Sequence, residues 1–257
     1  MKDEQRQHLL EALNKNVRAD GRKLLDYRDI SITKGVSKTA EGSAQVKFGS
    51  TEVIAGVKME IGTPFPDRPE EGAIMVNAEL LPLSNPDFEP GPPGIDAIEL
   101  SRVIDRGIRE SKAIDLKKLS IKKGEKCWMI IIDICTINDD GNLIDASGLA
   151  ALAALQDARF PKYENEELDY KTKTDKKVEL LKAPLPVTVL KLGDNLLVDP
   201  DLMEQKSLDA RLTVTFTEDN KTICALQKGG ESPITAEEVG KMLDIAQEKA
   251  AYLRSLL

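Results

Sequence analysis

The sequence predicts an α+β domain built from two similar halves, each containing a β-hairpin followed by a helix. In the first half, residues 44–48 and 53–59 alternate apolar and polar side chains around Gly49-Ser50, a pair typical of a two-residue hairpin turn. In the second half, residues 212–216 alternate in the same way and lead through a polar turn into residues 223–227. This repetition indicates internal pseudo-symmetry.

A helix is expected after each hairpin and another near the N-terminus. The helix after the first hairpin is expected from Asp96 to Asp115, and the helix after the second hairpin from Thr235 to Leu257. Thr235 is a preferred N-cap residue, and Glu238 three positions later completes a capping box. The segment from Lys2 to Asn16 places three leucines at helical spacing, which predicts a short amphipathic helix.

The remaining segments of the first half differ sharply in composition. Residues Gly62 to Gly94 contain eight of the thirteen prolines around one apolar segment, Ala73 to Leu81. Long loops of this kind are usually functional or interfacial. The apolar run from Trp128 to Ile137 predicts a buried strand, and the Ala-rich run from Ala146 to Ala158 predicts a helix that packs closely against its neighbours.

A charged connector separates the two halves. Pro161 to Lys182 is crowded with alternating Lys, Glu and Asp and shows little apolar periodicity, so we expect a solvated linker. The expected organisation is an N-terminal helix and arm over residues 1–27, a first half over 28–160, a connector over 161–183 and a second half over 184–257.

Composition restricts the possible classes of function. The chain has 257 residues, a formal charge of −8 and a pI near 5.0, so it does not hold nucleic acid by bulk charge. The three cysteines lack a metal-binding spacing and are expected to be buried small side chains in a reducing compartment. The first residues lack an apolar signal region, so a cytoplasmic protein without membrane contact is expected.

The turn at residues 140–142, between the buried strand and the Ala-rich helix, has the form of a phosphate-binding turn. Backbone N–H groups at such a helix start can receive an anion. No Arg, Lys or His stands nearby in the sequence, however, and Asp139, Asp140 and Asp145 would repel a phosphate. The turn therefore suggests a fold inherited from phosphate-using enzymes in a subunit that does no chemistry itself.

Specific segments carry a family resemblance over nearly the whole chain. Three of them resemble the RNase PH family of phosphorolytic exoribonucleases: Arg18 to Arg22, Gly42 to Ala55 and Glu99 to Glu110. Three others resemble, within that family, the non-catalytic ring subunit of the archaeal exosome: Asp67 to Gly72, Asp140 to Ala146 and Asp209 to Thr213. The resemblance implies an RNase PH-like fold, in which the two pseudo-symmetric halves have a ribosomal-protein-like β-α-β topology.

The resemblance also implies that catalytic groups are missing. Active relatives use inorganic phosphate to cleave the last phosphodiester of an RNA 3′ end, and they hold it with a Gly-Thr-Arg element. The matching positions here are Asn142-Leu143-Ile144, and the position of the catalytic carboxylate falls on Ala210. A one-residue shift would bring in Asp209, although alternation along a strand would place its side chain on the opposite face. No catalytic residue, metal ion or cofactor is therefore expected, with Asp209 kept as an alternative.

Four arginines are the candidate RNA-binding residues. On the predicted helix, Arg102, Arg106 and Arg109 form one stripe that can follow RNA phosphates. The alternative is ion pairing within the helix to three flanking carboxylates, Glu99, Asp105 and Glu110. The resemblance favours RNA, because this helix lies near the partner's active site in related rings. Arg68, in the proline-rich loop, is a weaker candidate whose alternative role is a loop salt bridge.

The resemblance implies a function in assembly. A catalytically inactive subunit of this kind would pair with an active RNase PH-like homologue, and three heterodimers would close a hexameric ring around single-stranded RNA. RNA-binding cap subunits would complete the exosome for 3′-to-5′ phosphorolytic degradation. The alternatives are a stand-alone phosphate-dependent exoribonuclease and an RNA- or ribosome-binding module without degradative activity.

Overall fold

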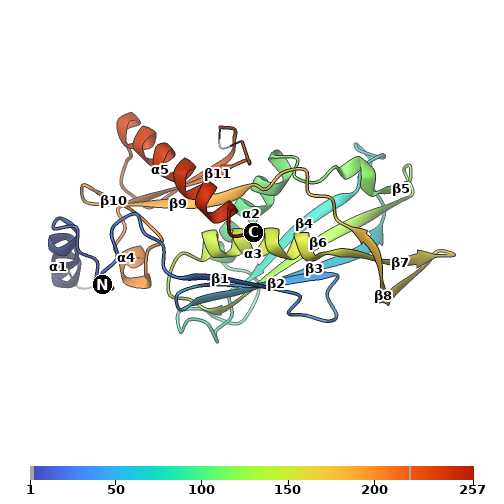
Figure 1. Cartoon of the computed structure of the whole chain (residues 1–257), viewed down its shortest axis with the longest axis horizontal. Coiled ribbons are helices and arrows are strands. Elements are labelled where there is room, and N and C mark those ends of the chain that lie inside the picture. The colour runs from blue at the N-terminus through green and yellow to red at the C-terminus, as the bar shows by residue number, and fades with distance from the viewer. Residues whose placement is uncertain (1–2, 220) are drawn as a thin grey trace.

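The computed structural model describes residues 3–219 and 221–257, and its elements are arranged in layers (Figure 1). Lys2, the first residue of the expected N-terminal helix, and Asn220, in the turn of the second expected hairpin, lie outside the described residues. Two sheets enclose a layer of two helices, and a further helix covers the outer face of the second sheet. The α+β class and the two related halves predicted from the sequence are confirmed.

The first sheet has the strand order β1-β2-β3-β6-β4, with β5 paired to β6. Its strands are β1 (Ile30–Lys34), β2 (Gly42–Phe48), β3 (Thr51–Gly62), β4 (Ala73–Glu79), β5 (Ser120–Lys122) and β6 (Lys126–Asn138). The expected two-residue turn joins β2 to β3, and Gly49 adopts a φ of +55° there. Buried and half-exposed residues alternate along β3, so this sheet buries mainly one face.

The second sheet has the order β10-β9-β11-β12, and all its neighbouring strands are antiparallel. Its strands are β9 (Leu185–Leu192), β10 (Asn195–Val198), β11 (Ala210–Phe216) and β12 (Ile223–Gly229). Both faces of β9 are covered, because Pro186 packs against Gly148 of the inner helix layer while Lys191 pairs with Glu238 of the outer helix. Such double burial explains its nearly continuous run of buried residues.

The inner helix layer consists of α2 (Ile95–Glu110) and α3 (Leu143–Asp157). Close packing of α3 depends on small residues, as the sequence predicts: a Cβ atom on Gly148 would collide with Pro186, and one on Gly42 of β2 would collide with the α3 backbone. The α2 helix ends five residues earlier than expected, at Glu110 rather than Asp115. Lys112 adopts a left-handed φ of +56°, which stops the helix.

The terminal helices follow their sequence signals. The outer helix α5 (Ala236–Arg254) begins at the predicted capping box of Thr235 and Glu238. The N-terminal helix α1 (Asp3–Leu13) buries Leu9 and Leu13 in a small apolar cluster with three leucines of β9 and β10. Trp128 is buried, as expected, and contacts Phe160 edge to face, with ring centroids 5.3 Å apart.

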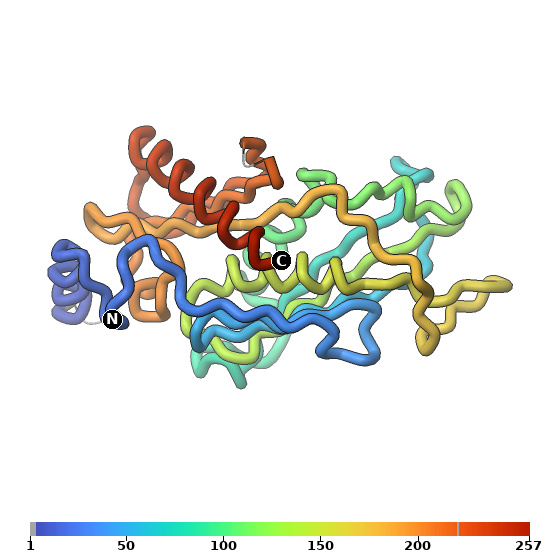
Figure 2. The backbone as a smooth tube through the Cα atoms, in the orientation of Figure 1, coloured from blue at the N-terminus to red at the C-terminus, as the bar shows by residue number. Residues whose placement is uncertain are grey.

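The connector is solvated, as the sequence predicts, but it is not an irregular linker. It forms a two-stranded sheet of β7 (Arg159–Glu164) and β8 (Glu167–Lys177), which extends from the end of the molecule opposite α1 (Figures 1 and 2). The alternating charges of the connector include no apolar face, so its sequence does not predict this hairpin. Its strands gain little free energy from burial. The short elements η1 (Leu116–Leu119) and α4 (Leu202–Lys206) complete the fold.

A buried ion pair fastens the N-terminal arm to the second half. Arg18 lies in a tight turn at residues 18–22, where Asp20 pairs with Arg22. The side chain of Arg18 is itself buried and donates two hydrogen bonds to Glu204, at 2.9 and 2.5 Å. It also donates to the carbonyl oxygens of Val198 and Asp199. This satisfied geometry compensates the desolvation of both charges.

We expect Glu204→Ala to lower the free energy of unfolding by about 3–5 kcal/mol, because it leaves the buried Arg18 guanidinium without its counter-ion. Urea unfolding followed by circular dichroism measures this loss. The control, Glu179→Ala, removes an exposed partner of Lys118 and should have a much smaller effect. Equal losses for the two variants would contradict the structural role of the buried pair.

Candidate functional site

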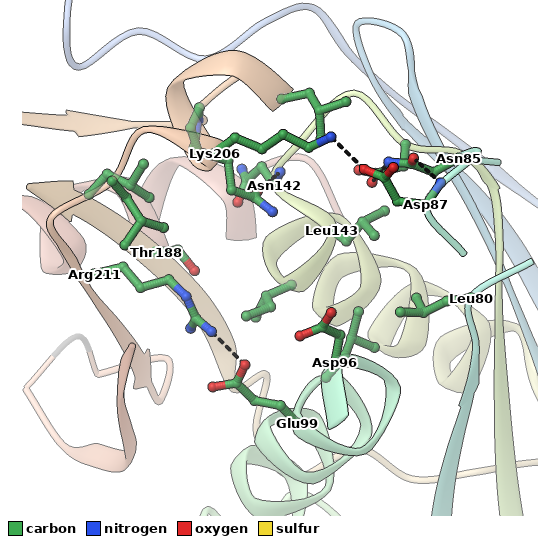
Figure 3. Close-up of a pocket in the computed structure, with 18 of the residues that line it drawn as sticks. Leu80, Asn85, Asp87, Asp96, Glu99, Asn142, Leu143, Thr188, Lys206 and Arg211 are labelled. Carbon is green, nitrogen blue, oxygen red and sulfur yellow. Dashed lines mark hydrogen bonds and ion pairs between the residues drawn. The ribbon is translucent and has the colours of Figure 1, made fainter. Parts of the chain in front are cut away.

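A cleft of about 440 Å³ lies between the two halves of the chain (Figure 3). The loop before α2 and α2 itself form one wall, and α4 and β11 form the other. The turn before α3 and the first residues of that helix contribute Asn142, Leu143 and Ile144, the three positions that the resemblance matches to the Gly-Thr-Arg element. The cleft therefore includes the turn that has the form of a phosphate-binding turn in the sequence.

Negative charge dominates the cleft. Among the described residues that line it, four carboxylates face two cationic side chains: Asp87, Asp96, Glu99 and Asp139 against Lys206 and Arg211. Both cations are paired across the cleft at 2.5 Å, Lys206 with Asp87 and Arg211 with Glu99 (Figure 3). These ion pairs neutralise the cations that could otherwise hold a phosphate.

The backbone of the turn is also occupied. Asn142 adopts left-handed angles, φ 61° and ψ 37°, as the N-cap of α3. Three consecutive N–H groups donate to protein side chains: Asp140 to Thr51 Oγ1 at 3.1 Å, Gly141 to Asp139 Oδ1 at 3.0 Å and Asn142 to Gln205 Oε1 at 2.9 Å. The turn keeps the shape of an anion site, but these three donors are already used.

The expectation that no cation stands near this turn is wrong. Arg28, two residues before β1, donates to the carbonyl oxygen of Asp140 at 2.7 Å and to both carboxylate oxygens of Asp199, at 2.7 and 2.9 Å. Because 112 residues separate Arg28 from Asp140, inspection of the neighbouring sequence could not reveal the contact. The carboxylate of Asp199 compensates the charge of Arg28, so this arginine links the turn to Asp199 as a structural ion pair.

Asp199 is fully buried and remains a good acceptor. Burial alone would raise its pKa, but the hydrogen bonds and charge of Arg28 lower the pKa below its ordinary value. Asp199 also accepts from Arg22 Nη1 at 2.9 Å and from Asn142 Nδ2 at 2.9 Å. The sequence analysis missed this residue, whose role depends on contacts distant in the chain.

Asp145 lies behind the turn in the interior, where it does not line the cleft. It accepts hydrogen bonds from the Thr188 backbone N–H at 3.1 Å and from the Tyr27 hydroxyl at 3.2 Å. Complete burial raises the pKa of Asp145 to about 7, and the nearby charge of Asp199 acts in the same direction. The sequence predicts that Asp145 repels phosphate at the turn, but the structure places it in the core.

The alternative catalytic residue Asp209 points away from the cleft. Its Oδ1 accepts from Arg6 of α1 at 2.6 Å, and its Oδ2 accepts from the Gly193 N–H at 2.7 Å. Ala210 begins β11 and is buried. Arg211 of the same strand lines the cleft, whereas Asp209 precedes the strand. Asp209 therefore has the contacts of a structural turn carboxylate.

The structure divides the predicted arginine stripe. Arg102 and Arg106 are exposed and line a groove with Ile95, Ile98 and Gln227, and neither side chain makes an ion pair within the described part of the chain. Arg109 instead pairs with Asp105 at 2.7 Å and donates to the Ile74 carbonyl oxygen at 2.9 Å. The salt-bridge alternative thus applies to Arg109 alone.

Arg68 lies with Arg109 in a separate groove of about 510 Å³. Its side chain is 58% exposed and has only a distant contact with Asp67, at 3.8 Å. The structure therefore brings the four candidate arginines together in two pairs, Arg102 with Arg106 and Arg68 with Arg109. The helical spacing could not show this division, because it follows from which residues pack around each side chain.

Over residues 3–219 and 221–257, no group of three or more His, Cys, Asp or Glu side chains has an arrangement that could hold a metal ion. Cys127, Cys135 and Cys224 are free thiols. Cys127 is buried, whereas the other two are half-buried, so burial is less complete than the sequence suggested. Within the same described ranges, each helix is too short or too polar to cross a membrane.

Comparison with protein families agrees with this fold and cleft. Residues 26–161 match the model of the 3′ exoribonuclease family domain 1, RNase PH, and residues 182–249 match that of domain 2. The chain belongs to the RNase PH family.

Two relatives are each called exosome complex component Rrp42. The protein of Methanothermobacter thermautotrophicus is 48% identical over 255 residues, covering 96% of this chain and 92% of the relative. The protein of Thermococcus onnurineus is 48% identical over 252 residues, with coverages of 97% and 92%.

Solved structures give the same relationship. A chain of the Archaeoglobus fulgidus exosome with RNA bound to the active site has a TM-score of 0.91 and 44% identity, with coverages of 98% of this chain and 97% of that one. A chain described as archaeal exosome core has a TM-score of 0.87 and 42% identity, with coverages of 98% and 96%. The structure of rice Rrp46, at 20% identity and a TM-score of 0.70, shares the fold.

The raised pKa of Asp145 predicts a specific pH dependence of stability. The unfolded carboxyl ionises near pH 4 and the folded one near pH 7, so the free energy of unfolding should fall as pH rises between these values. Asp145→Asn removes this titration. Relative to the unsubstituted chain, the variant should gain about 2–3 kcal/mol between pH 5 and pH 8.

Urea unfolding at several pH values measures the difference. The exposed Asp244→Asn is the matched control and should follow the unsubstituted chain at every pH. If Asp145→Asn also kept an unchanged pH profile, the folded carboxyl would not have the raised pKa.

Proposed function

We propose that the chain is a non-catalytic subunit of an archaeal-type exosome core. In this proposal it pairs with an active RNase PH-like homologue, and three such heterodimers form a hexameric ring for 3′-to-5′ phosphorolytic RNA degradation. The observation that carries the proposal is the cleft, where carboxylates, paired cations and occupied N–H groups replace the phosphate-binding chemistry. The names of its relatives support the same assembly.

The chain's own contribution is to support the partner's active site and to bind single-stranded RNA. Arg102 and Arg106 are suited to RNA phosphates, because both are exposed and neither is neutralised by a carboxylate in the described residues. Arg68 provides a second, exposed position, and Arg109 lies beside it with part of its charge already compensated by Asp105. RNA-binding cap subunits and a cytoplasmic location complete the proposal.

The stand-alone exoribonuclease remains the alternative from the enzyme class. It would require Asp209 to act on a substrate, but both oxygens of that carboxylate are bound to Arg6 and Gly193. A non-degradative RNA-binding module would share the groove lined by Arg102 and Arg106, which we call the arginine groove, and would not need a catalytic partner. Assembly and activity measurements separate these possibilities.

The isolated chain should release no nucleoside diphosphate from poly(A) in the presence of phosphate and Mg²⁺, since its cleft lacks a free cationic clamp. Co-expression with a homologue that carries the Gly-Thr-Arg element should give an active complex of three plus three subunits. Native mass spectrometry and a phosphorolysis assay measure both results. Release by the isolated chain that Asp209→Asn abolishes would establish the alternative enzyme.

The double variant Arg102→Glu/Arg106→Glu should leave the complex assembled but weaken its RNA binding. Loss of two phosphate contacts should reduce the salt slope of RNA affinity by about 1.4 units, at about 0.7 per contact for single strands. Fluorescence titration at several salt concentrations measures the slope. Lys23→Glu/Lys221→Glu makes the same charge change at exposed positions and should have no such effect. Parallel salt lines for both variants would exclude the arginine groove as an RNA contact.

A further inference from the structure

The C-terminal part of β8, in the β7–β8 hairpin, carries a cluster of lysines. We call Tyr170, Lys171, Lys173, Lys176 and Lys177 of β8 the lysine edge. Among the described residues β8 pairs only with β7, so its second edge faces solvent, and the hairpin projects from the body of the molecule (Figure 2). Residues 170–177 contain four lysines and one aspartate in a chain with a net charge of −8.

Asp169 lies near Lys171, whose charge helps to lower the pKa of that carboxyl, but three other acidic residues of the hairpin are engaged elsewhere. Glu164 pairs with Lys162 at 3.1 Å, Glu166 pairs with Lys126 at 2.8 Å, and Asp175 lies 3.6 Å from Arg159. Each of these carboxylates is therefore engaged by a cation outside the lysine edge. Within the described part of the chain, the side chains of three lysines make no ion pair or hydrogen bond: Lys171, Lys173 and Lys177.

An exposed aromatic ring accompanies the lysines. The side chain of Tyr170 is 48% exposed, and Lys58 of β3 lies beside its ring, with Nζ 5.1 Å from the centroid. Lys176 lies over the ring of Phe160 at 4.6 Å. Lysines alone would serve to protect an unpaired strand edge from aggregation. An exposed tyrosine does not serve that purpose, because it adds apolar surface to the edge.

Aromatic rings among free cations are the groups that bind single-stranded nucleic acid, since the cations hold phosphates and a ring stacks on a base. An acidic protein segment would also match the lysines, but it would leave Tyr170 without a role. We propose that the lysine edge binds single-stranded RNA outside the cleft and the arginine groove. This inference rests on the proposed function in one respect, that RNA is the ligand of the complex.

The test compares RNAs of two lengths on the chain alone and on its complex with the active homologue. A fluorescent oligouridine of about 30 nucleotides can reach a second surface, whereas one of about 8 nucleotides fills only a single site. In Lys171→Glu/Lys173→Glu/Lys177→Glu, affinity for the long RNA should fall at least about tenfold, and its salt slope should fall by about 2 units. Affinity of the complex for the short RNA should be unchanged.

A matched control and a conservative variant test the role of each group. Lys15→Glu/Lys23→Glu/Lys221→Glu makes an equal charge change at exposed lysines elsewhere and should leave the affinity for the long RNA as it was. Tyr170→Ala should weaken long-RNA binding by at least about fivefold, and Tyr170→Phe should restore it, because the phenyl ring still stacks. Circular dichroism confirms that each variant is folded.

The outcomes are distinct for the two proposals. Equal long-RNA affinity and salt slope for the lysine-edge variant and the control would overturn the lysine edge as an RNA surface, as would an absence of long-RNA binding. A partner protein on this edge would give that same result. Failure of the proposed ring function shows separately, as lack of phosphorolysis or lack of short-RNA binding by the complex, while the titration of the chain alone still reports on the lysine edge.

Discussion

The buried carboxylate of Asp199 is the interaction on which the arrangement of the two halves depends. It joins Arg28 just before β1, Asn142 at the start of α3 and its own segment between β10 and α4. An isolated charge in this position would be strongly destabilising, and the bidentate guanidinium of Arg28 makes it tolerable. The same contacts fix the turn that forms the floor of the cleft, so the shape of the site follows from a structural ion pair.

The interior also shows how a nearby counter-ion gives two buried aspartates different pKa values. Asp199 has Arg28 beside it, and its pKa lies below the ordinary value although burial acts in the opposite direction. Asp145 accepts hydrogen bonds only from neutral groups, and burial raises its pKa to about 7. Arg28 and Arg22 are thus both committed to Asp199 in the interior, and the cleft is left with paired cations and excess carboxylates.

An acidic chain can still present positive charge where its carboxylates are used elsewhere. In the cleft, the cations are neutralised by neighbours across the two walls. On α2, two arginines escape pairing because Glu99 is engaged by Arg211 and Asp105 by Arg109. On β8, Lys173 and Lys177 make no ion pair with the residues that the structure describes, while the nearby Glu166 and Asp175 pair with cations outside β8. Local pairing, more than net charge, therefore decides which surfaces can meet a polyanion.

The sequence by itself determined what depends on local chemistry: both hairpins, the Gly49-Ser50 turn, the capping box at Thr235 and the Ala-rich helix. These features arise from residues within a few positions of one another, where periodicity and turn preference act directly. Only the tertiary structure decided the contacts of Arg28 and the regular hairpin of the connector. It also decided the separation of Arg109 from its neighbours on α2. Each of these depends on which distant side chains share a buried space or a strand edge, and no local pattern records that choice.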